Sequence, residues 1–117
     1  MKRNMDIIRK IILTLRDADK PIDSVPDIPK DDFLAHAELI IEAGLVKGIV
    51  QPSGRKQGPE AAILFRLTWE GQDFADAIIE DTLWNKAKEN ILKPSASWSF
   101  AILLEYLRAE IRKRVGL

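Results

Sequence analysis

Cysteine is absent from the 117-residue sequence, and histidine occurs once. The chain therefore has no disulfide, no thiolate nucleophile and no cysteine-ligated metal. Six glycines and six prolines are too few for a collagen-like or low-complexity chain. A charge excess of one sign is also missing, because 18 basic residues balance 18 acidic ones. This balance excludes a strongly basic coat for nucleic acid but leaves room for a local basic patch.

Long apolar runs are missing as well. The longest uncharged stretches, near 61–65 and 100–104, are far shorter than the ~20 residues that a membrane helix needs. The N-terminus begins basic, as a secretory signal does, but Arg9 and Lys10 interrupt its apolar run and no small-residue cleavage site follows. We therefore expect a cytoplasmic chain with no membrane partner. At this length we expect a single domain over 1–117, with one core and no cofactor or metal.

Hydrophobic periodicity predicts helices over 4–18 and 30–43. Asn4 is the expected N-cap of the first helix, and Gly44 is expected to end the second in the left-handed conformation. Between them, three prolines within nine residues predict an extended connector in place of a normal helix. Three apolar residues are expected to pin this connector to the core: Ile22, Val25 and Ile28.

A β-hairpin is predicted next, over about 45–68. Its β-type segments are 45–50 and 61–68, and the segment between them, 51–60, contains two prolines and two glycines. Ten residues exceed what a tight hairpin turn needs. We expect this loop to project from the body.

Two helices are predicted after the hairpin. The first is capped by Thr68 and ends at Pro94, and we assign both Trp69 and Trp84 to its buried side. The second covers about 96–115 and has a wide apolar face. One continuous stripe on it is formed by Phe100, Leu104, Leu107, Ile111 and Val115.

The order of these elements is typical of an α+β winged-helix domain, similar to a winged helix-turn-helix, in which the hairpin is the wing. Two strings sharpen the interpretation: EAGLV at 42–46, where a helix enters a strand, and LTWEG at 67–71, where a strand enters a helix. Together they resemble the recognition helix, wing and post-wing helix of bacterial winged-helix regulators. The short connector replaces the helix that usually braces the recognition helix, so ordinary groove docking is in doubt.

A closer resemblance covers almost the whole chain. Residues 1–10, the segment LTWEGQDF at 67–74 and the segment DTLWNKAK at 81–88 resemble a bacterial and prophage family catalogued as domain of unknown function 2513. That family is similar to the YjcQ-like winged-helix proteins. The resemblance implies a winged-helix fold and residence in mobile-element genes. It implies no reaction, cofactor or established site.

Charge gives opposite indications for the two candidate DNA-binding elements. Segment 17–45 carries eight acidic residues against Lys20 and Lys30, so helix 30–43 is disfavoured in a groove lined by phosphates. The hairpin is basic, and such a wing can follow the backbone of double-stranded DNA. Its candidate nucleic-acid-binding residues are Lys47, Arg55, Lys56 and Arg66. The alternative is a solvated loop that charge keeps soluble.

Binding to a protein partner is the competing hypothesis. The acidic helix 30–43 or the C-terminal helix would supply the surface. The C-terminal helix is wider in its apolar face than one small core can cover, which predicts a homodimer seam. The candidate interface residues are Trp98, Leu103, Tyr106 and Leu107. The alternative is that these side chains simply close the core.

Catalysis is not expected. His36 is the only imidazole, and the sequence has no phosphate-binding loop, zinc-protease motif or nucleophile elbow. Adjacent acids such as Asp31 and Asp32 diverge on a helix and do not converge on a substrate. We expect a non-catalytic binding module, with weak or accessory DNA binding and regulation as the leading function.

Overall fold

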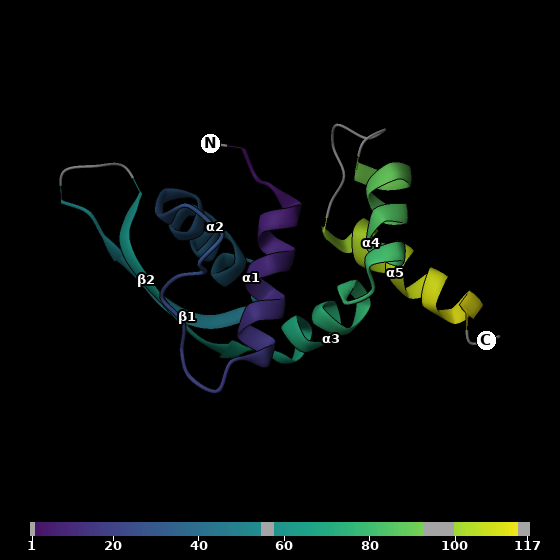
Figure 1. Ribbon diagram of the computed structural model, residues 1–117, viewed down its shortest axis with the longest axis horizontal. Coiled ribbons are helices and arrows are strands. Elements are labelled where there is room, and N and C mark those ends of the chain that lie inside the picture. Colours follow the sequence, from purple (N-terminus) through teal and green to yellow (C-terminus); the bar gives the residue numbers. More distant parts are fainter. Residues whose placement is uncertain (1, 55–57, 93–99, 115–117) are drawn as a thin grey trace. The chain divides into compact units, whose positions relative to one another are not determined.

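The computed structural model describes residues 2–54, 58–92 and 100–114 (Figure 1). Its elements in chain order are α1 (Met5–Asp17), α2 (Lys30–Glu42), β1 (Val46–Pro52), β2 (Pro59–Leu67), α3 (Trp69–Ile78), α4 (Asp81–Ala87), the π-helical turn η1 (Lys88–Leu92) and α5 (Phe100–Arg114). This mixed α+β architecture with one antiparallel hairpin confirms the predicted fold class and is compatible with a winged-helix-like arrangement. No described helix is long and apolar enough to cross a bilayer.

Contacts group the chain into two compact units, Met1–Ala75 and Asp76–Leu117. The first unit contains α1, α2 and the hairpin, and the second contains α4, η1 and α5. A single domain over the whole chain stays a prediction.

Helix α1 begins where the sequence predicts. The Asn4 side-chain oxygen accepts hydrogen bonds from the backbone N–H groups of Asp6 and Ile7, at 2.9 and 3.3 Å. This is the geometry of an N-cap. The apolar stripe of the helix is buried and consists of Met5, Ile8, Ile11, Ile12 and Leu15. Helix α1 packs on α2 and β2, so this stripe forms one wall of the first core.

The connector between α1 and α2 is extended, as its prolines predict. Ile22 forms an antiparallel bridge with Leu64 of β2, and Val25 and Ile28 are buried. The Lys10 ammonium lies 2.7 Å from an Asp27 carboxylate oxygen. That hydrogen bond holds the pKa of the Asp27 carboxyl below its ordinary value. The segment is therefore tied to both α1 and the sheet without forming a helix.

The hairpin is longer and its loop shorter than predicted. The antiparallel ladder continues through Gln51, which pairs with Ala61, to Pro52, which pairs with Pro59. The assignment of all of 51–60 to a loop is therefore wrong, because β-pairing tolerates a proline at the end of a strand. The loop end of the strands extends past α2 (Figure 1).

The prediction of one unbroken helix from Thr68 to Pro94 is also wrong. Helix α3 ends at Ile78, Glu80 adopts an extended backbone with φ −86° and ψ 123°, and α4 begins at Asp81. Ile78 and Ile79 are consecutive β-branched residues, which are weak helix formers. The apolar pattern continues across this break, so periodicity did not reveal it.

The second unit is built on contacts between α4 and α5. The buried apolar side chains of these two helices include Leu83, Trp84, Ala87, Leu103 and Leu107. The predicted stripe on the last helix is rotated by about one residue, since Leu103 and Glu110 are buried where Leu104 and Ile111 were expected. Because Glu110 is charged, the hydrophobic pattern does not show that its position belongs to the buried stripe of the helix.

Candidate nucleic-acid interface

Helix α2 ends in the left-handed turn that the sequence predicts. Gly44 has φ +78°, a conformation that favours glycine. The Gly44 N–H donates to the Ile41 carbonyl and the Leu45 N–H donates to the Ile40 carbonyl, both at 3.0 Å. This pair of bonds is a Schellman motif. It turns the chain directly from α2 into β1.

Thr68 joins the same turn to the start of α3. Its hydroxyl donates to the Gly44 carbonyl at 2.6 Å and accepts from the Gly71 N–H at 3.0 Å. Its own N–H donates to the Leu45 carbonyl at 2.9 Å. A Cβ on Gly71 would overlap the Leu45 carbonyl oxygen. The strings EAGLV and LTWEG, on which the winged-helix interpretation rests, are therefore joined by hydrogen bonds in one junction at the base of the hairpin.

The register of the hairpin brings two predicted cations together. Lys47 on β1 is the direct partner of Arg66 on β2, and both residues are exposed. The register shifts after Lys47, where the partners change from Arg66 to Leu64, so Phe65 is an extra residue on β2. Arg66 Nη1 donates to the Leu67 carbonyl at 3.1 Å, which holds the guanidinium beside the strand.

The other two predicted cations, Arg55 and Lys56, lie outside the described residues. The structure thus describes two of the four predicted cations, Lys47 and Arg66, and both lie at the base of the hairpin. Along the same outer face, Ile49 pairs with Ile63 and is 58% exposed. The face combines a cationic end with an apolar middle.

A hollow of about 640 Å³ adjoins the two cations. It is lined by the end of α2, the first residues of β1, Arg66, Thr68, Trp69 and Glu70. Trp69 is 82% exposed, so its assignment to the core is wrong. Helical geometry explains this exposure. Phe74 is fully buried, and a residue five positions away is rotated by about 140° around the helix, so Trp69 lies on another face. Trp84, in contrast, is buried as predicted.

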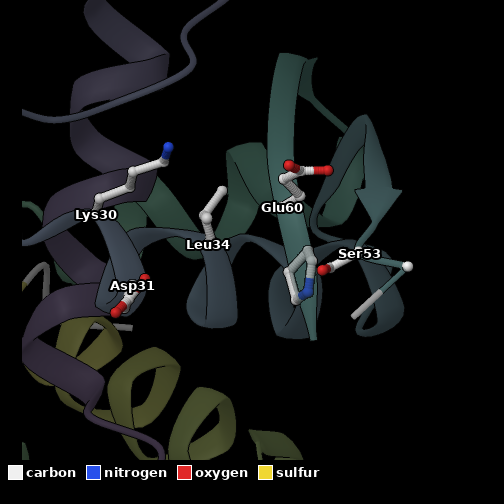
Figure 2. A pocket seen from close by; sticks show the side chains of 7 residues that line it. Lys30, Asp31, Leu34, Ser53 and Glu60 are labelled. Carbon is white, nitrogen blue, oxygen red and sulfur yellow. The ribbon is translucent and has the colours of Figure 1, made fainter. Parts of the chain in front are cut away.

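A second hollow, of about 650 Å³, lies between the start of α2 and the loop end of the hairpin. Figure 2 shows Leu34 on α2 facing the strand that carries Glu60, with Lys30 and Asp31 pointing in different directions. Among the described residues, its lining holds one ammonium group and two carboxylates, those of Asp31 and Glu60. A phosphate gains little at such a site.

The predicted dimer-seam residues lie in the second unit. Leu103 and Leu107 are fully buried within the chain and present no surface. Tyr106 is partly exposed, and its hydroxyl accepts a hydrogen bond from the Asn90 side-chain amide at 2.8 Å. Trp98 lies outside the described residues. A seam along this helix stays a prediction.

Glu110 forms an ion pair between α4 and α5. Its carboxylate lies 2.8 Å from Lys86 Nζ and 3.4 Å from Lys113 Nζ. The hydrogen bond from Lys86 holds the pKa of the Glu110 carboxyl below its ordinary value, against the opposing effect of burial. Lys113 is one of four basic residues near the end of α5, with Arg108, Arg112 and Arg114, so part of this basic cluster has a structural partner.

His36 is fully buried on α2. Its Nε2 accepts a hydrogen bond from the Asn4 N–H at 2.9 Å, which places the ring proton on Nδ1. Nδ1 donates to the Asp32 carbonyl at 2.7 Å. Nε2 thus joins α2 to the residue that caps α1, and Nδ1 bonds within α2. Among the described residues, no group of three or more His, Cys, Asp or Glu could hold a metal ion.

The described fold defines a mixed α+β, winged-helix-like class of protein with a partly cationic hairpin. Within it, the chain belongs to the family of hypothetical proteins DUF2513, whose family model matches residues 2–97. An uncharacterised protein of Haemophilus influenzae is 34% identical over 104 residues, which cover 85% of this chain and 86% of that protein. No solved structure matches the chain. The family predicted from the sequence is confirmed.

Proposed function

We propose that the chain is a non-catalytic module that binds the backbone of double-stranded DNA through the outer face of its hairpin. The observation that carries the proposal is the direct pairing of Lys47 with Arg66. Like charges opposite each other on neighbouring strands destabilise a sheet. Neither side chain forms an ion pair within the described part of the chain. A polyanion at this face would relieve the repulsion.

The shape of the face suits a phosphate backbone better than base edges. Lys47 and Arg66 stand at the rim of the hollow that Trp69 also lines, where an indole can pack on a sugar while its N–H donates. Glu70 lines the same hollow and limits its affinity for anions. Contacts of this kind fix position and carry little sequence information. We therefore propose binding with weak sequence preference, extended by Arg55 and Lys56 of the loop.

The proposal gives α2 a supporting role and includes no reaction. Asp31 and Glu60 oppose phosphates at its first turn, and His36 uses both ring nitrogens within the fold. The likeness to YjcQ-like winged-helix proteins, residence in prophage genes and a cytoplasmic location stay predictions.

The test is duplex binding measured by fluorescence anisotropy over a series of salt concentrations. The Lys47→Ala/Arg66→Ala variant should lower the magnitude of the slope of log affinity against log salt by about 2, because each lost phosphate contact removes about 0.9. The matched control is Lys20→Ala/Arg112→Ala, which removes the same charge from exposed positions elsewhere. Absence of salt-dependent binding, or an equal loss in the control, would refute the proposal.

A second candidate function is binding to a protein. It is favoured by the apolar middle of the same face, where Ile49, Ile63 and Phe65 are exposed. Exposed aromatic and aliphatic side chains that gather on one face are typical of protein interfaces. The sequence-based variants of this hypothesis, with the acidic helix 30–43 or the C-terminal helix as the surface, stay predictions.

A further inference from the structure

The two edges of the hairpin are not equivalent. On the outer side of β2, the Ile22 N–H donates to the Leu64 carbonyl at 3.0 Å and the Leu64 N–H donates to the Ile22 carbonyl at 2.9 Å. Strand β2 therefore has neighbours on both sides. Strand β1 pairs only with β2 in the described sheet, so its other edge has no strand beside it.

The bridge to Ile22 fixes which backbone groups of β1 point outward. Leu64 directs its N–H and C=O toward Ile22, and its partner across the hairpin is Gly48. In an antiparallel ladder, residues opposite each other direct these groups either both inward or both outward. Gly48, and Val50 two residues on, therefore direct their N–H and C=O groups away from β2. No described group forms a hydrogen bond with them.

Side chains alternate with these free backbone groups. Lys47, Ile49 and Gln51 lie on the outer face of β1, and all three are exposed. Gly48 faces inward, where a Cβ would contact Ile63, Leu64 and Ile41. Natural sheets protect an open edge with charge, proline or bulges. On β1 the lysine and the proline fall at either side of 48–50, and the stretch itself is unprotected.

We propose that this edge pairs antiparallel with β1 of a second copy of the chain, on a two-fold axis at Ile49. Gly48 then lies opposite the partner's Val50, and every N–H and C=O of these residues is bonded. Ile49 faces the partner's Ile49, and Lys47 faces the partner's Gln51. The result is one sheet of four strands, with β1 of each copy at its centre.

Charge, hydrogen bonding and apolar contact together favour this register. An axis at Lys47 would set the lysines of the two copies against each other, which is unfavourable. An axis at Gln51 would set Val50 against the partner's Pro52, which has no N–H to donate. An axis at Gly48 would bond the same stretch but would set each Ile49 against the partner's Lys47. The axis at Ile49 keeps Pro52 outside 48–50, opposite the partner's Val46, and sets the two exposed Ile49 side chains against each other. It also aligns Ile63 and Ile49 of both copies in one row, because Ile49 and Ile63 are already direct partners.

The test is the oligomeric state of the full chain, measured by analytical ultracentrifugation over a range of concentrations. The wild type should form a dimer. Ile49→Lys places two ammonium groups at the axis and should weaken the dimer by about tenfold or more. Ile63→Lys is the matched control, because it adds the same charge to the same face one strand away from the seam. It should leave the dimer largely unchanged.

Val50→Pro is an independent test of the dimer. It removes one outward N–H and leaves the bonds between β1 and β2 intact, so it should also give a monomer. Circular dichroism melting checks that each variant is folded. A wild type that stays monomeric at high concentration overturns the proposal, and so does a dimer that tolerates Ile49→Lys. A monomer that binds an extended peptide of another protein overturns it as well, because the edge would then serve a different occupant.

Discussion

The junction between α2 and the hairpin and the junction between α4 and α5 are held in different ways. The first uses backbone groups and one hydroxyl at positions close to turns, centred on Gly44, Thr68 and Gly71. The second uses apolar side chains and the ion pair between Lys86 and Glu110, neither of which belongs to a turn or a cap. Residues that form turns and caps leave a recognisable motif in the sequence. An ion pair between two helices leaves no such motif.

The largest expected effect breaks the first junction. Gly71→Ala adds a methyl group where the Leu45 carbonyl stands, so the gain in helix propensity is outweighed by overlap with backbone. We expect a loss of about 2 kcal/mol or more in the free energy of unfolding, measured by urea titration. The control is Gly54→Ala, whose Cβ meets nothing within 4 Å and should change stability by less than about 0.5 kcal/mol. Equal effects at the two glycines would contradict the role of Gly71 in this junction.

A smaller effect is expected from the hydroxyl in the same junction. Thr68→Val removes the acceptor for the Gly71 N–H and the donor to the Gly44 carbonyl while keeping the shape of the side chain. We expect a loss of about 1 kcal/mol in thermal or urea unfolding, as for other N-caps. Thr68→Ser retains the hydroxyl and should stay close to the wild type. If serine were as damaging as valine, the methyl group and not the hydrogen bonds would be responsible.

The smallest effect concerns the second junction and depends on pH. The pKa of the Glu110 carboxyl is lowered in the folded chain, so the unfolded chain binds a proton there at a higher pH than the folded chain does. Stability from this pair is therefore present above the ordinary carboxyl range and falls as pH drops through it.

Melting curves between neutral and acidic pH measure the difference. Glu110→Gln should lose less stability on acidification than the wild type does. Glu105→Gln, an exposed acid on the same helix, should follow the wild type. An unchanged acid response in Glu110→Gln would show that the pair does not stabilise the second unit.

The sequence predicted best what local backbone chemistry determines. The Asn4 cap, the left-handed Gly44 and the proline-rich connector follow from single residues, and each is confirmed. The break before Glu80 and the phase of α5 were missed, because an apolar pattern continues across the first and a buried acid interrupts the second.

The candidate site was predicted only in part. Lys47 and Arg66 were named for their charge, but their direct pairing depends on a register that the sequence does not state. The aromatic pattern wrongly predicts Trp69 as core, although this residue follows a capping threonine and lies on the opposite face of α3 from Phe74. The outward backbone groups of β1 depend on the bridge to Ile22, and no composition or periodicity contains that information.

The hydroxyl of Thr68 has one more implication. It bonds the carbonyl that follows α2 and an amide of the first turn of α3, so it ties the base of the hairpin to both helices. A molecule arriving at the strands near that base would meet a surface already set in its bound conformation. Little ordering entropy would then be lost on association, so that even a few contacts could give measurable affinity.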